Sequence, residues 1–184
     1  LAVYLVVFDI PPQVIGLNFE ELGLGVLWDG LLYCFIPVGI TAIVLELGSR
    51  VVGYPTEKES LQRLYIPSTK LGIALLYLVV LPAGVVFDEV VYRASIGAMY
   101  TAFGVFGVPA WSLVLLTSIP FGLQHYYQGS WANVVFTGVL GVVFGAVYVW
   151  TGSLAVVIVG HGTLNAASFA GHIRKLRGDE RTET

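Results

Sequence analysis

Three ionisable residues lie together inside an otherwise apolar stretch. Asp88, Glu89 and Arg93 follow an apolar run that begins near Leu71, and mostly apolar residues resume after them. A charged side chain in the middle of a membrane helix costs about 2.5–3.5 kcal/mol on the insertion scale, so such residues indicate function by default. Glu89 and Arg93 are four residues apart with the acid first, the favourable order for a helical ion pair. We therefore predict a direct Glu89–Arg93 pair.

Asp88 is the acidic residue of the group that the predicted Glu89–Arg93 pair leaves without an ion-pair partner. It lies about 100° around the helix from Glu89 and five residues before Arg93, so it pairs less well with the arginine. A buried carboxylate without a full partner can act as a general base. The alternative is structural: all three residues form a salt-bridge network that fixes helix packing.

Two histidines and an asparagine add polar groups to other apolar segments. His125 ends the run SIPFGLQH, four residues after Phe121. His161 and Asn165 are four residues apart, so they share one face of a helix. Either histidine alone could simply bond to a backbone carbonyl. Together with the acidic pair, these groups suit one pocket that could bind Zn²⁺, activate a water or donate to an oxyanion.

The elements that must position these residues are membrane helices. Of the 184 residues, 57% are hydrophobic and only 11% are charged. The mean hydropathy is +0.83. A soluble domain has about 25% charged residues, so the composition excludes an ordinary soluble domain, a disordered chain and a nucleic-acid binder with a basic face. The single cysteine, Cys34, allows no internal disulfide. The fold class is an all-α, polytopic transmembrane helix bundle.

Four or five apolar segments can each cross about 30 Å of hydrocarbon, which takes about 20 helical residues. They cover residues 22–47, 71–107 with the charged group inside, 109–125, 131–150 and 153–173. We expect one membrane-embedded domain over residues 1–184, with its core at about 19–172 and a charged cytoplasmic tail at 174–184.

Two features of these segments predict local structure. Asp29 and Pro37 in the first segment indicate that it is kinked or amphipathic at its start. Gly141 and Gly145 form a G-x-x-x-G in the fourth, which permits close helix packing, although general glycine richness explains it about as well.

Basic residues gather on one side of the predicted topology. With five spans, the 48–70 loop and the C-terminal tail share a side and hold eight of the nine Lys and Arg: Arg50, Lys58, Arg63, Lys70, Arg174, Lys175, Arg177 and Arg181. The positive-inside rule places that side in the cytoplasm. By the same counting, His125 falls near the cytoplasmic end of its helix and Asp88 lies deeper. Their convergence requires a tilted or shifted second helix.

The polar groups together resemble the motifs of the CPBP intramembrane proteases, the CAAX protease and bacteriocin-processing (Abi) family. The family pattern is E-E-x-x-x-R, then F-x-x-x-H, then H-x-x-x-N. The order and spacing agree here in Asp88-Glu89-x-x-x-Arg93, Phe121-x-x-x-His125 and His161-x-x-x-Asn165. The resemblance covers roughly residues 19–172. It implies the CPBP-type helical core and an intramembrane endopeptidase.

The resemblance also implies roles for the motif residues. Asp88 and His125 activate a water, and Glu89 and Arg93 support the site. The implied partners are membrane lipid and a peptide or prenylated protein. A prenylated CAAX protein, a bacteriocin leader and a membrane anchor all fit as substrates.

His161 and Asn165 take the third implied role, stabilising the oxyanion or helping to hold the catalytic centre. Members of the family are called metalloproteases, and a metal-free glutamate mechanism has also been argued. Two possibilities therefore stand side by side: a divalent metal such as Zn²⁺ held by Glu89, His125 and His161, and a site without a metal.

Asp88 departs from the family pattern, which usually has Glu at this position. Aspartate is one methylene shorter, so its carboxylate sits about 1.5 Å further back, and a misplacement of about 1 Å can cost catalysis about 10²-fold. On this argument, Asp88→Glu is expected to raise activity.

Two other classes of protein remain as alternatives. The first is an ion- or proton-coupled transporter in which Asp88, Glu89, His125 and His161 relay protons or bind a cation. The second is a non-catalytic membrane scaffold that keeps the polar pocket for stability. Transporters often show inverted repeats, and none is recognisable in this sequence.

Overall fold

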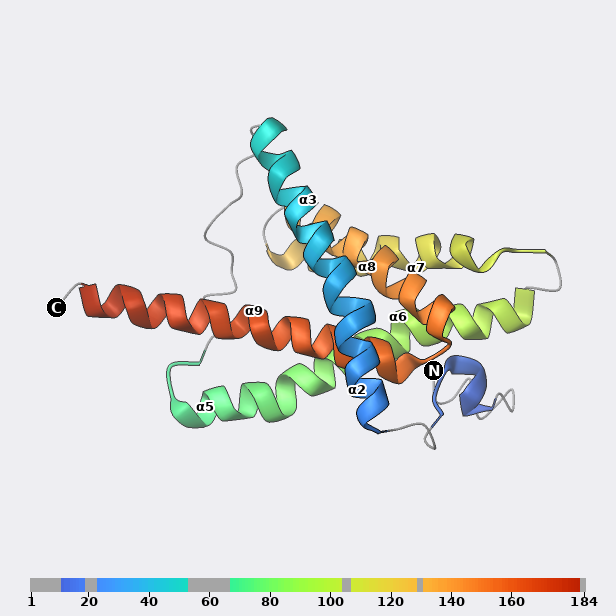
Figure 1. Cartoon of the computed structure of the whole chain (residues 1–184), viewed down its shortest axis with the longest axis horizontal. Helices are drawn as coiled ribbons and strands as arrows, with labels where there is room; N and C mark the ends of the chain where they lie inside the picture. Colours follow the sequence, from blue (N-terminus) through green and yellow to red (C-terminus); the bar gives the residue numbers. More distant parts are fainter. Residues whose placement is uncertain (1–10, 19–22, 53–66, 104–106, 129–130, 183–184) are drawn as a thin grey trace.

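The computed structural model describes residues 11–18, 23–52, 67–103, 107–128 and 131–182 (Figure 1). The regular elements in these ranges are helical, which confirms the all-α fold class. In order they are η1 (Pro12–Ile15), α2 (Leu24–Gly30), η3 (Leu31–Phe35), α3 (Ile36–Val52), α5 (Lys70–Leu75), η4 (Leu76–Val80), α6 (Leu81–Phe103), α7 (Ala110–Gln124), η6 (His125–Gln128), α8 (Trp131–Thr151) and α9 (Leu154–Thr182).

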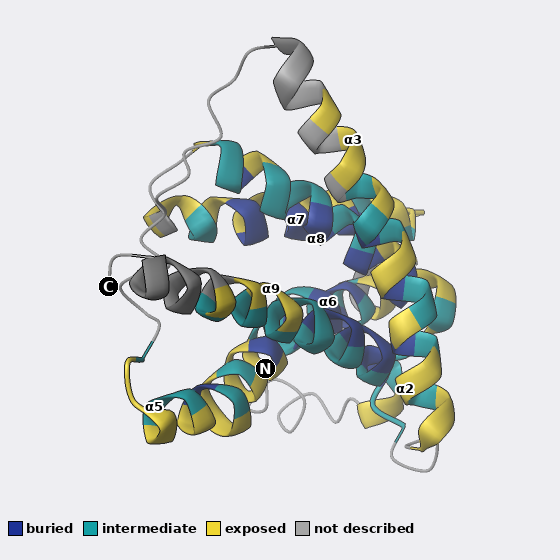
Figure 2. Cartoon of the chain, turned by 60° about the vertical axis from the view of Figure 1, so that its left-hand side comes forward, coloured by how far each residue is buried: buried dark blue, intermediate teal, exposed yellow. Residues whose placement is uncertain are grey.

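Four helices in the described part of the chain are long and apolar enough to cross a membrane: Leu24–Thr41, Lys70–Thr101, Trp131–Thr151 and Leu154–Gly171. They match four of the five predicted segments. The remaining segment, 109–125, forms α7, whose 15 residues continue directly into the four of η6 and together come close to the about 20 that a full span needs. Large apolar side chains are exposed on the outer faces, drawn yellow in Figure 2, as a bundle surrounded by lipid requires.

Each of the first two spans contains a π-helical turn just before a proline. The turn η3 precedes Pro37, and η4 precedes Pro82. A proline has no backbone N–H, and its ring clashes with the carbonyl four residues earlier, so the helix must adjust there. The irregularity predicted near the start of the first span is therefore present as this turn.

Helices α7 and α8 pack closely on the predicted G-x-x-x-G. A Cβ atom at Gly141 would lie 3.0 Å from Cδ1 of Phe121, and one at Gly145 would lie 2.7 Å from Cγ1 of Val114. The glycines thus have a specific packing role, and the close approach seats Phe121 against α8.

The α2–η3 segment approaches α9 equally closely. A Cβ atom at Gly30 would lie 2.7 Å from Cγ1 of Val159, and one at Gly160 would collide with Cys34. The Cys34 thiol is buried and donates weakly to the Val156 carbonyl, with the sulfur 3.9 Å from the oxygen. This crossing holds α9 in the centre of the bundle.

The polar segments of the chain, the C-terminal tail and the 48–70 loop, are described only in part. The last helix was expected to end near residue 173, but α9 continues as a helix to Thr182, so the start of the charged tail is helical. Of the basic residues used for the topology, Lys58 and Arg63 lie outside the described residues. Helix α5 begins, and α9 ends, on the same side of the molecule in Figure 1.

Candidate active site

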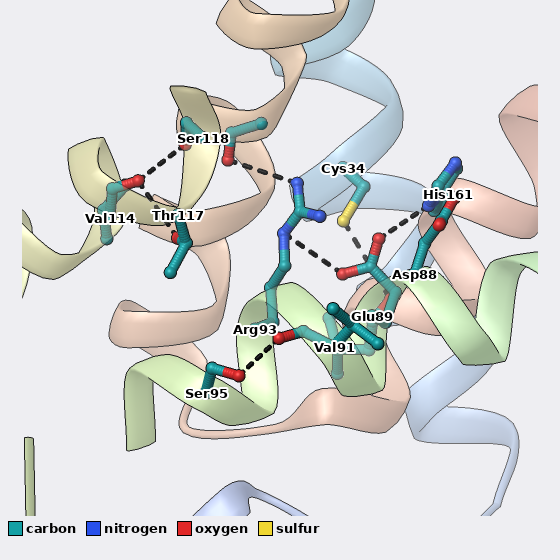
Figure 3. A network of polar contacts seen from close by, with 12 residues as sticks. Cys34, Asp88, Glu89, Val91, Arg93, Ser95, Val114, Thr117, Ser118 and His161 are labelled. Carbon is teal, nitrogen blue, oxygen red and sulfur yellow. Dashed lines mark hydrogen bonds and ion pairs between the residues drawn. The ribbon is translucent and has the colours of Figure 1, made fainter. Parts of the chain in front are cut away.

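Glu89 and Arg93 form the predicted ion pair on α6. Nε of Arg93 lies 3.2 Å from Oε2 of Glu89, and the two side chains are 1% and 0% exposed (Figure 3). The arginine also donates from Nη2 to the carbonyl oxygen of Gly141 on α8, over 3.3 Å. The pair therefore connects α6 to α8 at the point where the glycines bring α7 and α8 together.

Aromatic rings enclose the guanidinium and the second histidine. Cζ of Arg93 lies 4.2 Å from the ring centre of Phe121, a cation–π contact that offsets part of the cost of burying the charge. His161 stacks on Phe144 with ring centres 5.0 Å apart, and the edge of Phe121 meets it at 6.0 Å. The sequence motif identified Phe121, whereas no spacing pointed to Phe144.

His161 is held at both ring nitrogens. Nδ1 lies 2.6 Å from Oε1 of Glu89, and Nε2 lies 3.1 Å from Nδ2 of Asn165. The carboxylate only accepts, so Nδ1 carries the hydrogen and donates it to Glu89. Nε2 of the neutral ring is then an acceptor, and it accepts from the Asn165 amide. The Glu89–Arg93 pair of α6 and the His161–Asn165 pair of α9 therefore meet through the contact between Glu89 and His161.

Asp88 lies beside this pair, and two residues that the sequence analysis missed hold it there. The side-chain amide of Gln124 donates to Oδ1 of Asp88 over 3.3 Å. The Tyr92 hydroxyl in turn donates to Oε1 of Gln124 over 3.0 Å. The only available signals were local: Tyr92 follows Asp88 by four residues, and Gln124 directly precedes His125.

His125 makes the backbone contact that was considered for a lone histidine. Its Nδ1 lies 2.8 Å from the Phe121 carbonyl oxygen, so Nδ1 is the donor and Nε2 of the neutral ring carries the lone pair. Because Gln124 adjoins His125 and reaches Asp88, the end of α7 and the middle of α6 lie at one level. This contact places Gln124, the neighbour of His125, beside Asp88, which simple counting along the helices had made difficult.

The proposed metal ligands do not form a ligand set. In the part of the chain that the structure describes, no group of three or more His, Cys, Asp or Glu side chains is arranged to hold a metal ion. The reason is local: Glu89 faces Arg93 and His161, and both nitrogens of His161 are engaged. Nδ1 of His125 turns to its own helix. These donors do not fit a Zn²⁺ site, which needs three or four converging ligands.

A carboxylate, two histidines and an amide donor inside a bundle of membrane helices are groups that a membrane-embedded hydrolase could use. The family model described as "Type II CAAX prenyl endopeptidase Rce1-like" matches residues 70–167, more than half of the chain. The chain therefore belongs to this family of membrane proteases, and the predicted CAAX-protease resemblance is confirmed. The matched segment includes all seven motif residues from Asp88 to Asn165. Comparisons with curated proteins and with solved structures gave no match.

Proposed function

We propose that this protein is an intramembrane endopeptidase that hydrolyses a peptide bond in or near the bilayer, with Asp88 as the general base. One observation carries the proposal: the 3.3 Å hydrogen bond from Gln124 to Asp88, which brings this carboxylate to the level of His125 and beside the Glu89–His161 pair. Peptide hydrolysis needs a base and an oxyanion donor in one place. This arrangement supports both.

Asp88 and His125 act on the attacking water. The Gln124 amide bonds to Oδ1 of Asp88, which leaves Oδ2 to accept a proton. The Nε2 lone pair of His125 accepts the other hydrogen of the water and so orients its oxygen toward the scissile carbonyl. As the new C–O bond forms, the proton moves to Asp88, which becomes a neutral carboxylic acid.

Asn165 is the donor to the oxyanion. One N–H of its amide is used on Nε2 of His161, and the second N–H of the same group can bond to the negatively charged oxygen of the tetrahedral intermediate. His161 has no N–H left to offer in this tautomer, so it orients Asn165 rather than donating itself. When the C–N bond breaks, Asp88 returns its proton to the leaving amine, and the products are a carboxylic acid and an amine.

Glu89 and Arg93 support this geometry. Glu89 fixes the tautomer and the direction of the His161 ring, and Arg93 holds the other oxygen of Glu89 in an ion pair. The protein's own side chains thus cover every role in the reaction, and the proposed steps pass through no metal.

We further propose that the substrate is a prenylated protein that reaches the site from the membrane lipid, as the description of the family as prenyl endopeptidases suggests. The proposed orientation places the 48–70 loop and the C-terminus in the cytoplasm, because eight of the nine basic residues lie there.

The test uses the purified protein in liposomes and a peptide that ends in a farnesylated CAAX sequence. Release of the C-terminal fragment is measured by mass spectrometry, with the unprenylated peptide as substrate control. Asp88→Asn should abolish release, whereas Asp29→Asn, the same change on α2 at a residue outside the motifs, should not. Release that persists in Asp88→Asn would move the base elsewhere. Ion flux without cleavage in the wild type would favour the transporter alternative.

A further inference from the structure

We propose that Tyr92 and Gln124 form a clamp that positions the Asp88 carboxylate and adapts the site to an aspartate at this position. The inference rests on the proposed role of Asp88 as general base. The two contacts that define the clamp are Tyr92 Oη to Gln124 Oε1 at 3.0 Å and Gln124 Nε2 to Asp88 Oδ1 at 3.3 Å.

The hydrogen-bonding capacities of the three groups allow one orientation of the Gln124 amide. A carboxylate only accepts, so the NH₂ group must face Asp88, and the amide oxygen must face Tyr92. The tyrosine hydroxyl then donates. With the amide reversed, two oxygens would oppose each other at the Asp88 contact. The Tyr92 hydroxyl therefore keeps Gln124 in the one orientation that supports the carboxylate.

The clamp is itself fixed by packing. The Tyr92 ring meets the Phe121 ring edge to face, with centres 5.3 Å apart, and Phe121 is 2% exposed. Tyr92 and Asp88 are four residues apart on α6, so they lie on one face of that helix. Gln124 is the last residue of α7 and comes directly before His125. The Gln124 amide thus connects the face of α6 that carries Asp88 and Tyr92 to the end of α7, next to His125.

This arrangement suits the shorter acid. A carboxylate set back by one methylene needs a donor that reaches it, and the long side chain of Gln124 provides one. The amide contacts one oxygen and leaves the other for a proton, which is what positioning of a general base requires. The expectation that Asp88→Glu raises activity changes accordingly: with Gln124 in place, a longer acid meets the amide and is displaced.

The sharpest test exchanges one methylene between the two partners. Asp88→Glu and Gln124→Asn should each lower kcat by about 10²-fold with KM nearly unchanged, because each misplaces the base by about 1 Å. The double variant keeps the total length and should recover to within about 3-fold of wild type, because contacting residues couple strongly. If the effects of the two single changes simply multiply in the double variant, the clamp is overturned.

A second measurement does not depend on catalysis. The ¹⁵N resonance of the Gln124 side-chain amide, recorded in detergent micelles, should shift in Tyr92→Phe. It should stay in place in Tyr77→Phe, which removes a similar hydroxyl that donates over 3.2 Å to the Ala166 carbonyl on α9. Tyr92→Phe should also lower kcat while the melting temperature stays close to that of Tyr77→Phe.

The Gln124 resonance and the cleavage assay test the clamp and the proposed function separately. An unshifted Gln124 resonance in Tyr92→Phe overturns the clamp whatever the enzyme does. A shifted resonance in a protein that cleaves no prenylated peptide would support the contact, contradict the proposed function and remove the clamp's role in cleavage.

Discussion

His161 donates its Nδ1 hydrogen to Glu89 across a 2.6 Å contact that joins α9 to α6. The other oxygen of Glu89 faces Arg93, so this carboxylate is divided between a cation on its own helix and a histidine on another. Asp88, its neighbour in sequence, points to Gln124 and keeps an oxygen available. Two adjacent acids therefore have different environments, which is how one site separates a structural acid from a reactive one.

The first prediction concerns the stability of the buried pair. Arg93→Ala leaves Glu89 buried without its cation, and Glu89→Gln does the reverse, so each should lower the free energy of unfolding by about 3–5 kcal/mol. Thermal unfolding in detergent measures the effect. Arg174→Ala, at an exposed position on α9, serves as the matched loss of a positive charge and should change little. Unchanged melting temperatures in both site variants would show that the pair does not stabilise the fold.

The second prediction concerns Asn165. Asn165→Ala removes the proposed oxyanion donor and should lower kcat by about 10²–10³-fold, the usual cost of such a donor, with a much smaller effect on KM. Thr163→Ala is the matched control, because the Thr163 hydroxyl donates to the Val159 carbonyl of its own helix over 2.8 Å. Cleavage kinetics on the farnesylated peptide distinguish them. Equal kcat values in the two variants would assign the oxyanion to another group.

The sequence predicted the parts of the site that depend on spacing within one helix. Glu89–Arg93 and His161–Asn165 are i,i+4 pairs, and local geometry alone brings their side chains together. The all-α fold followed from composition, because few charges and long apolar runs leave helices as the means of crossing a bilayer.

Contacts between helices could not be read in the same way. The Gln124–Asp88 bond depends on how far α7 reaches along α6, and that distance is set by side-chain packing between helices far apart in sequence. Phe144 of α8 stacks on His161 of α9, which again joins two helices through side-chain packing. Neither contact has a fixed sequence spacing, so the sequence alone could not supply it.

The third prediction tests the proposed orientation. A cysteine at Arg174 should react with a membrane-impermeant maleimide applied from the cytoplasmic side, because α9 carries this residue past the end of its span at Gly171. A cysteine at Pro109, which precedes α7 at the opposite end of the topology, should react only from the other side. The wild type is the control, since its Cys34 is fully buried and should stay unlabelled. Labelling of both variants from the same side would contradict the five-segment topology.

The fourth prediction is that Gly141→Ala lowers cleavage although it replaces none of the polar side chains of the site. The added methyl would lie 3.0 Å from Cδ1 of Phe121 and 3.1 Å from Cβ of Ser118, so α7 must move away from α8. Phe121 then shifts from its place over Arg93, and the end of α7, with Gln124, shifts relative to Asp88.

A shift smaller than the ~1 Å that can cost about 10²-fold should still reduce kcat by about 10-fold. Gly84→Ala on α6 is the matched control: its methyl meets no atom within 4 Å, and replacing a helix-interior glycine with alanine is worth about 1 kcal/mol of helix stability. Its activity should therefore match that of the wild type. Cleavage rates and melting temperatures are measured for both variants. If Gly141→Ala cleaves as fast as Gly84→Ala, the α7–α8 contact does not set the position of the catalytic groups, and α6 with α9 must hold the site without it.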